Sequence, residues 1–213
     1  MEFEQLVKIA GDEPVFETGL ILAGNVDPRD VLLQLSRWTR AGRIYQLRRG
    51  LYTLAPPYQK VQPHPFLVAN MMVHASYVSC QSALEFHGLI PEHVPVIVSV
   101  TTLRPGRWET PLGAFEFRHL KKALFAGYKL TDLAGRQKAF VATPEKALLD
   151  LIYLQPGADD GAYLNELRLH SLETLDIDRL HRLALDSGSP KLLRAATRIS
   201  LLAEKEAGEY RTL

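Results

Sequence analysis

The stretch RAGRIYQLRRGLYTL, residues 40–54, determines how the N-terminal part of the chain is interpreted. Four of its fifteen positions are arginine, and apolar residues alternate with polar ones on both sides of Arg48-Arg49-Gly50. Residues that favour strands flank a turn that contains glycine, which is the pattern of a β-hairpin. The sequence therefore predicts a hairpin over Arg43–Leu54, with two arginines at its tip.

A helix is predicted immediately before this hairpin. Asp27 can cap it, Pro28 suits the first helical position, and Gly42 ends it after Ala41. At 100° per residue, one face carries Val31, Leu32, Leu35, Trp38 and Thr39, and we expect this face to pack. The opposite face carries Arg29, Leu33, Ser36, Arg37 and Arg40, with Gln34 at its margin.

Two shorter helices are expected before this one, over residues 2–10 and 15–24, the second ending at Gly24-Asn25. Three helices followed by a hairpin is the order of elements in a winged helix-turn-helix. The sequence therefore predicts a winged helix-turn-helix DNA-binding domain over residues 1–55.

Charge is distributed unevenly along the chain. The net charge is only +1, but residues 27–54 hold six arginines and two acids, so they contribute +4 and the remainder contributes +1 − 4 = −3. A basic segment on an acidic remainder is typical of a protein that contacts a polyanion at one end.

Each polar side chain of this basic segment has a role in a DNA complex. At the hairpin tip, Arg48 and Arg49 would neutralise phosphates and release counterions. On the helix, Arg29, Gln34, Arg37 and Arg40 are candidates to contact base edges, as arginine does with guanine and glutamine with adenine. Ser36 and Arg43 are expected on the DNA backbone. Taken singly, the helix or the hairpin would more often be a solvated face, and a winged helix can also bind protein.

Residues 56–64 are rich in proline and predict a stiff linker. Residues 65–213 predict a mixed α/β domain with a helical C-terminal region, so the expected fold class is α+β. The expected strands cover 76–80, 94–102, 114–120 and 139–143, with VPVIVSVTT central in the sheet. Residues 103–113 are expected to form turns. Helices are expected at 66–75, 81–89 and 144–154, and from Asp159 onward with breaks near Ser171 and at residues 187–190.

No catalytic or metal-binding motif stands out. Among seven histidines, His64, His74, His87 and His93 surround Cys80, but their spacing matches no zinc signature. Cys80 lies where a strand meets a helix, a place that can lower a thiol pKa, yet no motif supplies its base. We therefore expect no cofactor and no small-molecule substrate. The alternative is an enzyme whose α/β domain has a polar pocket around Glu85, His87 and His93.

Two further charged groups have plain structural explanations. Glu145 and Asp150 are five residues apart on one expected helix, about 140° from each other, so helix capping and solvation explain them better than a carboxylate pair does. Lys191, Arg194 and Arg198 share one side of another expected helix. A solvated face is favoured there over a second nucleic-acid contact.

Targeting signals are not evident in the sequence. The acidic, amphipathic N-terminus lacks the features of a signal peptide, and no run approaches the ~18 apolar residues of a membrane span. With Cys80 as the single cysteine, no internal disulfide can form, which fits a reducing compartment. The expected localisation is cytoplasmic, without a membrane partner.

Several motifs in order resemble the AbiEi-type antitoxins of type IV toxin–antitoxin systems. They are AGRIYQLRRGLYTL, HPFLVA, SYVSCQSALEFHGLIPE and AFVATPEKALLDLIYL, and the resemblance extends from about Val15 to Leu154. The last 55 or so residues are not matched.

This resemblance implies a two-part antitoxin tied to phage defence. The winged helix would bind inverted repeats in its own promoter and repress the operon. The second domain would counteract a nucleotidyltransferase-type toxin, in this family without a stable complex. The DNA-binding role would fall on the 27–41 helix and the 43–54 hairpin, and no catalytic residue carries over.

Overall fold

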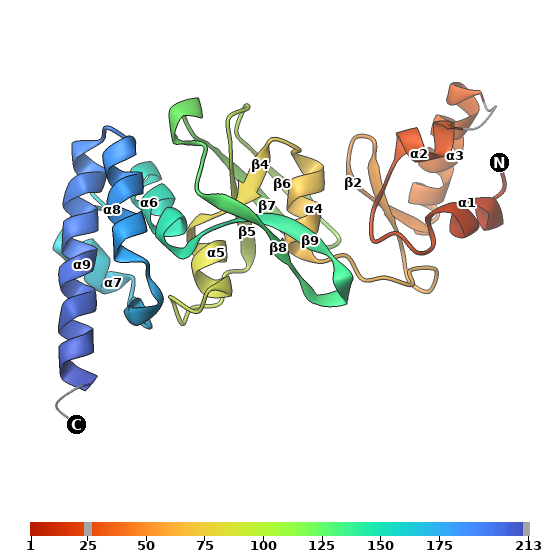
Figure 1. The fold of residues 1–213 in the computed structure, drawn as a ribbon. Coiled ribbons are helices and arrows are strands. Elements are labelled where there is room, and N and C mark those ends of the chain that lie inside the picture. Colours follow the sequence, from red (N-terminus) through yellow and green to blue (C-terminus); the bar gives the residue numbers. More distant parts are fainter. Residues whose placement is uncertain (24–26, 211–213) are drawn as a thin grey trace.

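The computed structural model describes residues 1–23 and 27–210, with side chains through residue 206. Helices and strands alternate in a mixed α+β fold with two sheets. The chain forms an N-terminal module, a central domain built on the larger sheet and a C-terminal group of helices, in that order along the molecule (Figure 1). None of the described helices is both long and apolar enough to span a membrane.

The N-terminal module combines helices with a small antiparallel sheet. Its elements are α1 (Phe3–Ala10), β1 (Phe16–Glu17), α2 (Thr18–Leu22), α3 (Pro28–Arg40), β2 (Ile44–Arg48) and β3 (Leu51–Leu54). The sheet order is β1-β3-β2. The predicted 28–41 helix and the hairpin are confirmed, and Gly50 takes the positive φ of 84° that the turn requires.

The prediction for residues 15–24 is only partly correct. Phe16 and Glu17 form a short strand that pairs with Tyr52 and Leu51, and only Thr18–Leu22 is helical. This strand depends on pairing with residues more than thirty positions away, which local periodicity cannot reveal. The expected stop at Gly24-Asn25 lies outside the described residues.

The larger sheet has the order β6-β7-β5-β4-β9-β8. Its pairs are antiparallel except β4 with β9 and β5 with β7. Its strands are β4 (Ser76–Val78), β5 (Val96–Thr101), β6 (Gly106–Thr110), β7 (Gly113–His119), β8 (Tyr128–Asp132) and β9 (Lys138–Ala142). The predicted central position of β5 is confirmed.

Two strands differ from the sequence-based expectation. Residues 103–113 were expected to form turns, but β6 lies there and forms a hairpin with β7 through one-to-one pairs from Gly106–Phe117 to Thr110–Gly113. Pro105, Gly106, Pro111 and Gly113 lie at or next to the ends of this strand, and residues of these types are typical of turns. No element was expected at β8 either. This strand forms by antiparallel pairing with β9.

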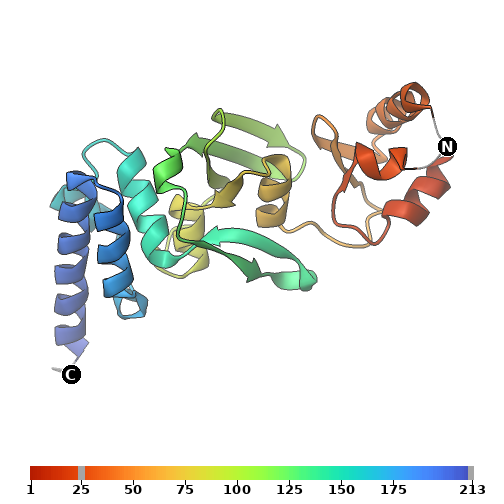
Figure 2. The ribbon, with the colours of Figure 1, turned by 45° about the horizontal axis from the view of Figure 1, so that its top comes forward.

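Helices cover the sheet and complete the chain. They are α4 (Pro65–Met72), α5 (Cys80–Phe86), α6 (Pro144–Leu154), α7 (Gly161–Glu166), α8 (Ile177–Asp186) and α9 (Pro190–Tyr210), with short 3-10 turns η1 (Lys122–Leu124), η2 (Ala134–Arg136) and η3 (Leu172–Thr174). The helices α6 to α9 lie together at the end opposite the N-terminal module (Figures 1 and 2). The predicted breaks near Ser171 and at 187–190 are confirmed.

Two apolar cores meet at the N-terminal hairpin. One core lies inside the N-terminal module and includes Ile44, Tyr52 and Leu54 of the hairpin. Leu47 and Leu51 of the same hairpin belong instead to the core of the central domain. Successive strand residues point to opposite faces, so one face of the hairpin packs in the N-terminal module and the other packs in the central domain.

The proline-rich linker is held at both ends. Lys60 forms an ion pair with Asp12 at 3.1 Å, and the Gln137 side chain accepts from the His64 N–H and donates to the Gln62 carbonyl. These bonds connect residues 56–64 both to the N-terminal module and to the central domain.

Candidate nucleic-acid interface

Helix α3 supplies the main part of the basic surface. The Asp27 carboxylate accepts from the Arg29 N–H at 2.7 Å, so the helix starts where the sequence predicted. Val31, Leu35 and Trp38 are buried against the rest of the module, which sets the helix orientation. Most of the positions between them consequently face solvent.

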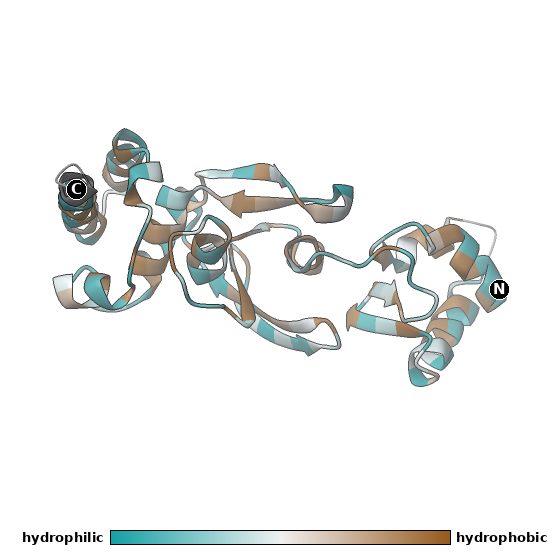
Figure 3. Ribbon diagram, turned by 90° about the horizontal axis from the view of Figure 1, so that it is seen from below, coloured by the Kyte–Doolittle hydropathy of each residue, from teal (hydrophilic) through white to brown (hydrophobic). Residues whose placement is uncertain are grey.

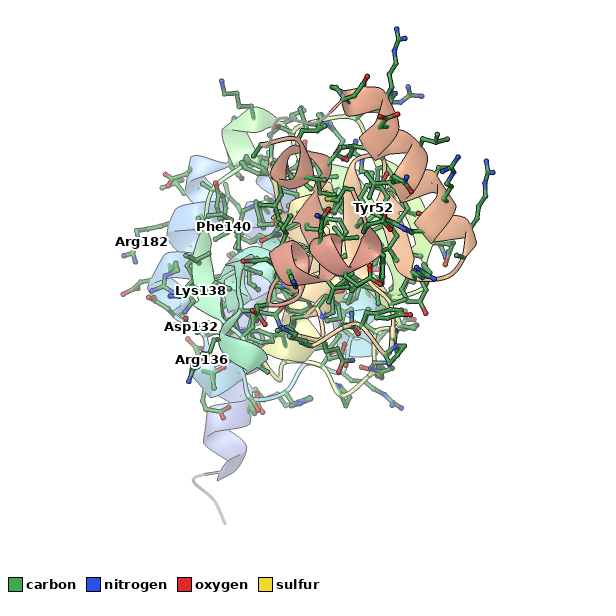
Figure 4. The ribbon with its side chains drawn as sticks, turned by 90° about the vertical axis from the view of Figure 1, so that its right-hand side faces the viewer. Tyr52, Asp132, Arg136, Lys138, Phe140 and Arg182 are labelled. Atoms are coloured by element: carbon green, nitrogen blue, oxygen red, sulfur yellow. The ribbon has the colours of Figure 1, made fainter. Side chains whose placement is uncertain are left out.

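The exposed side of α3 carries the predicted polar set. Arg29, Ser36, Arg37 and Arg40 are exposed, and Gln34 is half-buried. Within residues 1–23 and 27–206, none of these arginines forms an ion pair with a carboxylate. Seen from the N-terminal side, side chains that end in nitrogen project outward from α3 (Figure 4). Their charges remain available to a polyanion.

Two leucines interrupt this polar surface. Leu32 was expected on the packed face, but it is 54% exposed, and Leu33 is 49% exposed. The reason is that the small module covers only the narrow stripe formed by Val31, Leu35 and Trp38. Leu33 lies one turn from both Arg29 and Arg37, so an apolar group sits between two cations.

Arg43 follows α3 and is exposed at the start of the hairpin. Its guanidinium lies over the Phe3 ring, 5.0 Å from the ring centroid. This cation–π contact ties the segment between α3 and β2 to α1. It orients Arg43 next to the C-terminal end of α3, as the sequence interpretation required.

The two arginines of the hairpin tip have different surroundings. Arg48 donates to the Met72 carbonyl at the C-terminal end of α4, and its guanidinium lies 5.1 Å from the Trp108 ring centroid. Arg49 is exposed and forms no ion pair in the described part of the chain. Arg48 was expected beside Arg49 on a phosphate-binding tip, but the structure turns it toward the central domain.

A groove of about 420 Å³ lies at the same junction. Its lining includes Thr18, Arg48, Arg49, Met72 and His74. The Gly50 carbonyl accepts from the Thr18 N–H at 2.9 Å, which fixes the tip against the start of α2. The hairpin tip therefore contacts α2 through Gly50 and α4 through Arg48, while the side chains of Arg48 and Arg49 remain exposed.

The histidines considered for metal binding have separate partners. His64 accepts from the Phe66 N–H, His74 is 3.0 Å from Glu17, His87 is 2.8 Å from the Ala142 carbonyl, and His93 is 2.9 Å from Glu85. Among the residues that the structure describes, no group of three His, Cys, Asp or Glu is placed to hold a metal ion.

The polar pocket expected under the enzyme alternative is not assembled from its three residues. Glu85 pairs with His93 and accepts from the Val94 N–H at 3.0 Å, so it fastens the loop after α5. His87 points instead to the Ala142 carbonyl of β9. Burial lowers the pKa of His87.

Cys80 is fully buried at the start of α5. Burial raises the pKa of its thiol to about 12, and the nearby Asp150 carboxylate adds to this effect. The position at a helix start, which the sequence showed correctly, therefore does not produce a thiolate at neutral pH.

Glu145 and Asp150 were expected to be solvated, and the structure contradicts this. Both are buried in α6. Asp150 receives bonds from Lys146, from the Ser79 hydroxyl at 2.7 Å and from the Tyr77 hydroxyl at 2.9 Å. Glu145 accepts from the Asp176 N–H at 2.9 Å, at the start of α8. Although they share a helix, the two carboxylates serve different partners, as their 140° separation indicated.

The buried Asp150 cluster links α6 to the sheet. Burial raises the pKa of the Asp150 carboxyl, and the Lys146 ammonium together with the Ser79 and Tyr77 hydroxyls acts in the opposite direction. A small cavity of about 70 Å³ adjoins Lys146 and Asp150. Local periodicity did not reveal this burial, because Tyr77 of β4 and Ser79 just after it lie 73 and 71 positions from Asp150 in the chain.

The cations on the basic side of α9 bond to other parts of the chain. Lys191 donates to the Ile152 and Gln155 carbonyls at 2.6 and 2.5 Å, and Arg194 donates to the Asp159 carboxylate at 2.7 Å. Arg198 donates to the Asp159 backbone carbonyl. Arg194 and Arg198 are exposed, as expected for a solvated face, and Lys191 is half-buried. All three also bond within the protein, so they connect α9 to α6 and to the turn after it.

The geometry thus defines an α+β protein with one basic, solvent-facing helix at its N-terminal end. Comparison with protein-family models and with curated proteins finds no match to this chain.

Proposed function

We propose that this chain is a DNA-binding transcriptional repressor whose N-terminal module is a winged helix-turn-helix. The observation that carries the proposal is the outer side of α3, where Arg29, Arg37 and Arg40 project without carboxylate partners in the described residues. The element order α1-β1-α2-α3-β2-β3, with the sheet order β1-β3-β2, supports this module type.

In this proposal α3 enters the major groove. Arg37 and Arg29 contact guanine edges, Gln34 contacts adenine, and exposed Leu33 packs on a thymine methyl group. Arg40, Arg43, Ser36 and Arg49 contact the DNA backbone, where they supply affinity without sequence preference. Arg48 holds the hairpin on the central domain and positions Arg49.

The repressor is further proposed to act as the antitoxin of a type IV toxin–antitoxin system. This part rests on the motif series that resembles the AbiEi-type antitoxins, which extends into the central domain. The functional partners are then the chain's own promoter and a nucleotidyltransferase-type toxin. The chain acts in the cytoplasm, without a cofactor and without catalysis of its own.

The DNA-binding proposal is tested by gel shift with the DNA upstream of the gene at two salt concentrations. We expect Arg37→Ala to reduce affinity for this DNA by ~10-fold or more and to reduce its preference over unrelated DNA. Arg49→Ala should weaken binding to both DNAs equally and reduce the dependence on salt.

Arg182→Ala is the matched control, because Arg182 is an exposed arginine on α8, on the flank away from α3 (Figure 4). It should bind both DNAs as the wild type does. Equal binding of wild type and Arg37→Ala to the upstream DNA would contradict the assignment of α3.

The antitoxin role needs a separate measurement. Co-expression of the full chain with an adjacent nucleotidyltransferase should restore growth, and Arg37→Ala should restore it equally, because the central domain acts on the toxin. Continued growth arrest with both proteins would remove the antitoxin role and leave the repressor role intact.

A further inference from the structure

The larger sheet ends in two edge strands with different surroundings. The edge strand β6 lies next to β2 of the N-terminal hairpin, where Arg48 stacks on Trp108. At the other edge, β8 pairs with β9 on one side and with no other strand among residues 1–23 and 27–210. Figure 2 shows β8 along the lower border of the sheet. An open edge presents unpaired backbone groups to solvent.

The hydrogen bonds of the β8–β9 hairpin show which backbone groups are unpaired. Leu133 N–H donates to the Gln137 carbonyl at 2.8 Å, and Thr143 N–H donates to the Gly127 carbonyl at 2.9 Å. The residues between pair one to one, and bonded pairs alternate with non-bonded pairs in an antiparallel ladder. The backbone groups of Tyr128, Leu130 and Asp132 therefore point away from β9.

The same three residues present their side chains on one face of the strand. Leu130 is 54% exposed, and its cross-strand partner Phe140 is 41% exposed. Tyr128 stacks on Tyr77 and contacts Phe140 edge-on. In Figure 3 the two strands of this hairpin lie along one flank with brown positions between teal ones, and Figure 4 shows Asp132, Lys138 and Phe140 along one side of the molecule.

We infer that β8 is a self-association edge, which pairs antiparallel with β8 of a second copy of this chain about a two-fold axis at Leu130. In this register Leu130 lies opposite the other Leu130, and Tyr128 lies opposite Asp132 of the second copy. All three residues then exchange their outward N–H and C=O groups, giving about six inter-strand hydrogen bonds. The two Leu130–Phe140 patches join across the axis.

Charge and polarity select this register over its neighbours. An axis at Lys129 would place two lysines opposite each other, which is unfavourable. An axis at Thr131 would place Leu130 opposite Asp132. With the axis at Leu130, Lys129 faces Thr131, and Asp132 keeps its 3.1 Å ion pair with Lys138.

Such pairing would join two six-stranded sheets into one and leave both N-terminal modules free at the far ends. A symmetric pair of modules is the arrangement that reads two half-sites related by a two-fold axis. The inference itself rests on the edge of β8 and is tested without DNA.

The first test measures the mass of the full chain by sedimentation equilibrium between about 1 μM and about 1 mM, a range suited to a small interface. The wild type should dimerise within this range. Leu130→Arg should remain monomeric, because it places two cations at the axis. Leu185→Arg is the control, since Leu185 is also an exposed leucine and lies on α8, away from β8. A wild type that stays monomeric throughout, or a dimer that survives Leu130→Arg, would overturn the inference.

The second test uses a milder change and reports the register. Leu130→Cys should form a disulfide-linked dimer under a mild oxidant, because the Cα atoms of a hydrogen-bonded pair lie ~5.5 Å apart. Lys129→Cys should not, and the wild type should not, since Cys80 is buried. Efficient cross-linking of Lys129→Cys but not of Leu130→Cys would refute the proposed axis.

Discussion

The carboxylate of Asp150 is a residue whose importance depends on its burial. It lies inside the protein with Lys146, Ser79 and Tyr77 as partners, so both of its oxygens are bonded. A buried charge with its partners removed is costly, whereas an exposed pair contributes little.

We therefore expect Asp150→Asn to lower the free energy of unfolding by about 3–5 kcal/mol, because the Lys146 ammonium would stay buried without its counter-charge. Urea unfolding measures this. Asp12→Asn is the control, because Asp12 pairs with Lys60 at the surface, and its effect should be small. Equal stability of Asp150→Asn and wild type would show that the buried pair contributes nothing.

His64 gives a prediction for pH. Its Nδ1 accepts from the Phe66 N–H at the start of α4, and burial lowers the pKa of the ring. The His64 ring therefore binds a proton less readily in the folded state than in the unfolded chain. The stabilisation is present above the ordinary pKa of about 6.5 and is lost as pH falls through the lowered folded value.

We expect the wild type to lose more stability between pH 7.5 and pH 5 than His64→Asn does. Asparagine caps a helix without titrating, so it keeps the bond to the Phe66 N–H. It also removes the group at position 64 that takes up a proton when the chain unfolds at low pH. Urea unfolding at the two pH values measures both slopes. Parallel pH profiles for the two proteins would exclude His64 as a contributor.

At the scale of elements, the β2–β3 hairpin makes two kinds of contact, one within the N-terminal module and one with the central domain. Its strands close the sheet of the N-terminal module, and its tip meets α4 and β6 through Arg48. The Met72 carbonyl that Arg48 binds lies at the C-terminal end of α4, where a cation is favoured. Arg49, next in sequence, has no such contact among the described residues.

This division predicts different outcomes for neighbouring arginines. Arg48→Ala should loosen the hairpin from the central domain and make the 56–64 linker several-fold more sensitive to limited proteolysis. Arg49→Ala should leave the linker as resistant as in the wild type. If both variants are cleaved alike, Arg48 does not hold the two parts together.

At the scale of the whole molecule, the hairpin joins two apolar cores. Val15, Leu47 and Leu51 belong to the core of the central domain, although they precede the linker in sequence. The N-terminal module and the central domain should therefore unfold together, since separating them exposes these side chains.

Leu51→Ala tests this coupling. It should cost about 2–5 kcal/mol and shift the unfolding of the N-terminal module away from that of the central domain. The two tryptophans, Trp38 and Trp108, report on one part each when the other is replaced by phenylalanine. In Leu54→Ala, which affects only the N-terminal core, the two midpoints should stay closer together. If the two unfolding midpoints lie equally far apart in Leu51→Ala and Leu54→Ala, the hairpin does not couple the two cores.

Most local elements could be predicted from the sequence because their signals are local. The Asp27-Pro28 start of α3, the Thr143-Pro144 start of α6 and the apolar run of β5 each depend on neighbouring residues. The strands β1, β6 and β8 were missed because each is short or is bounded by turn residues, and each is stabilised by a partner strand.

The candidate DNA-binding side of α3 followed from helical periodicity alone, and its exposed arginines lie where that periodicity placed them. The sequence by itself thus determined which residues form α3 and the hairpin and which side of α3 is charged. Only the tertiary structure decided that Arg48 binds the central domain, that Asp150 is buried and that β8 forms an open edge. These outcomes depend on contacts between residues far apart in the chain, and local periodicity carries no information about such contacts.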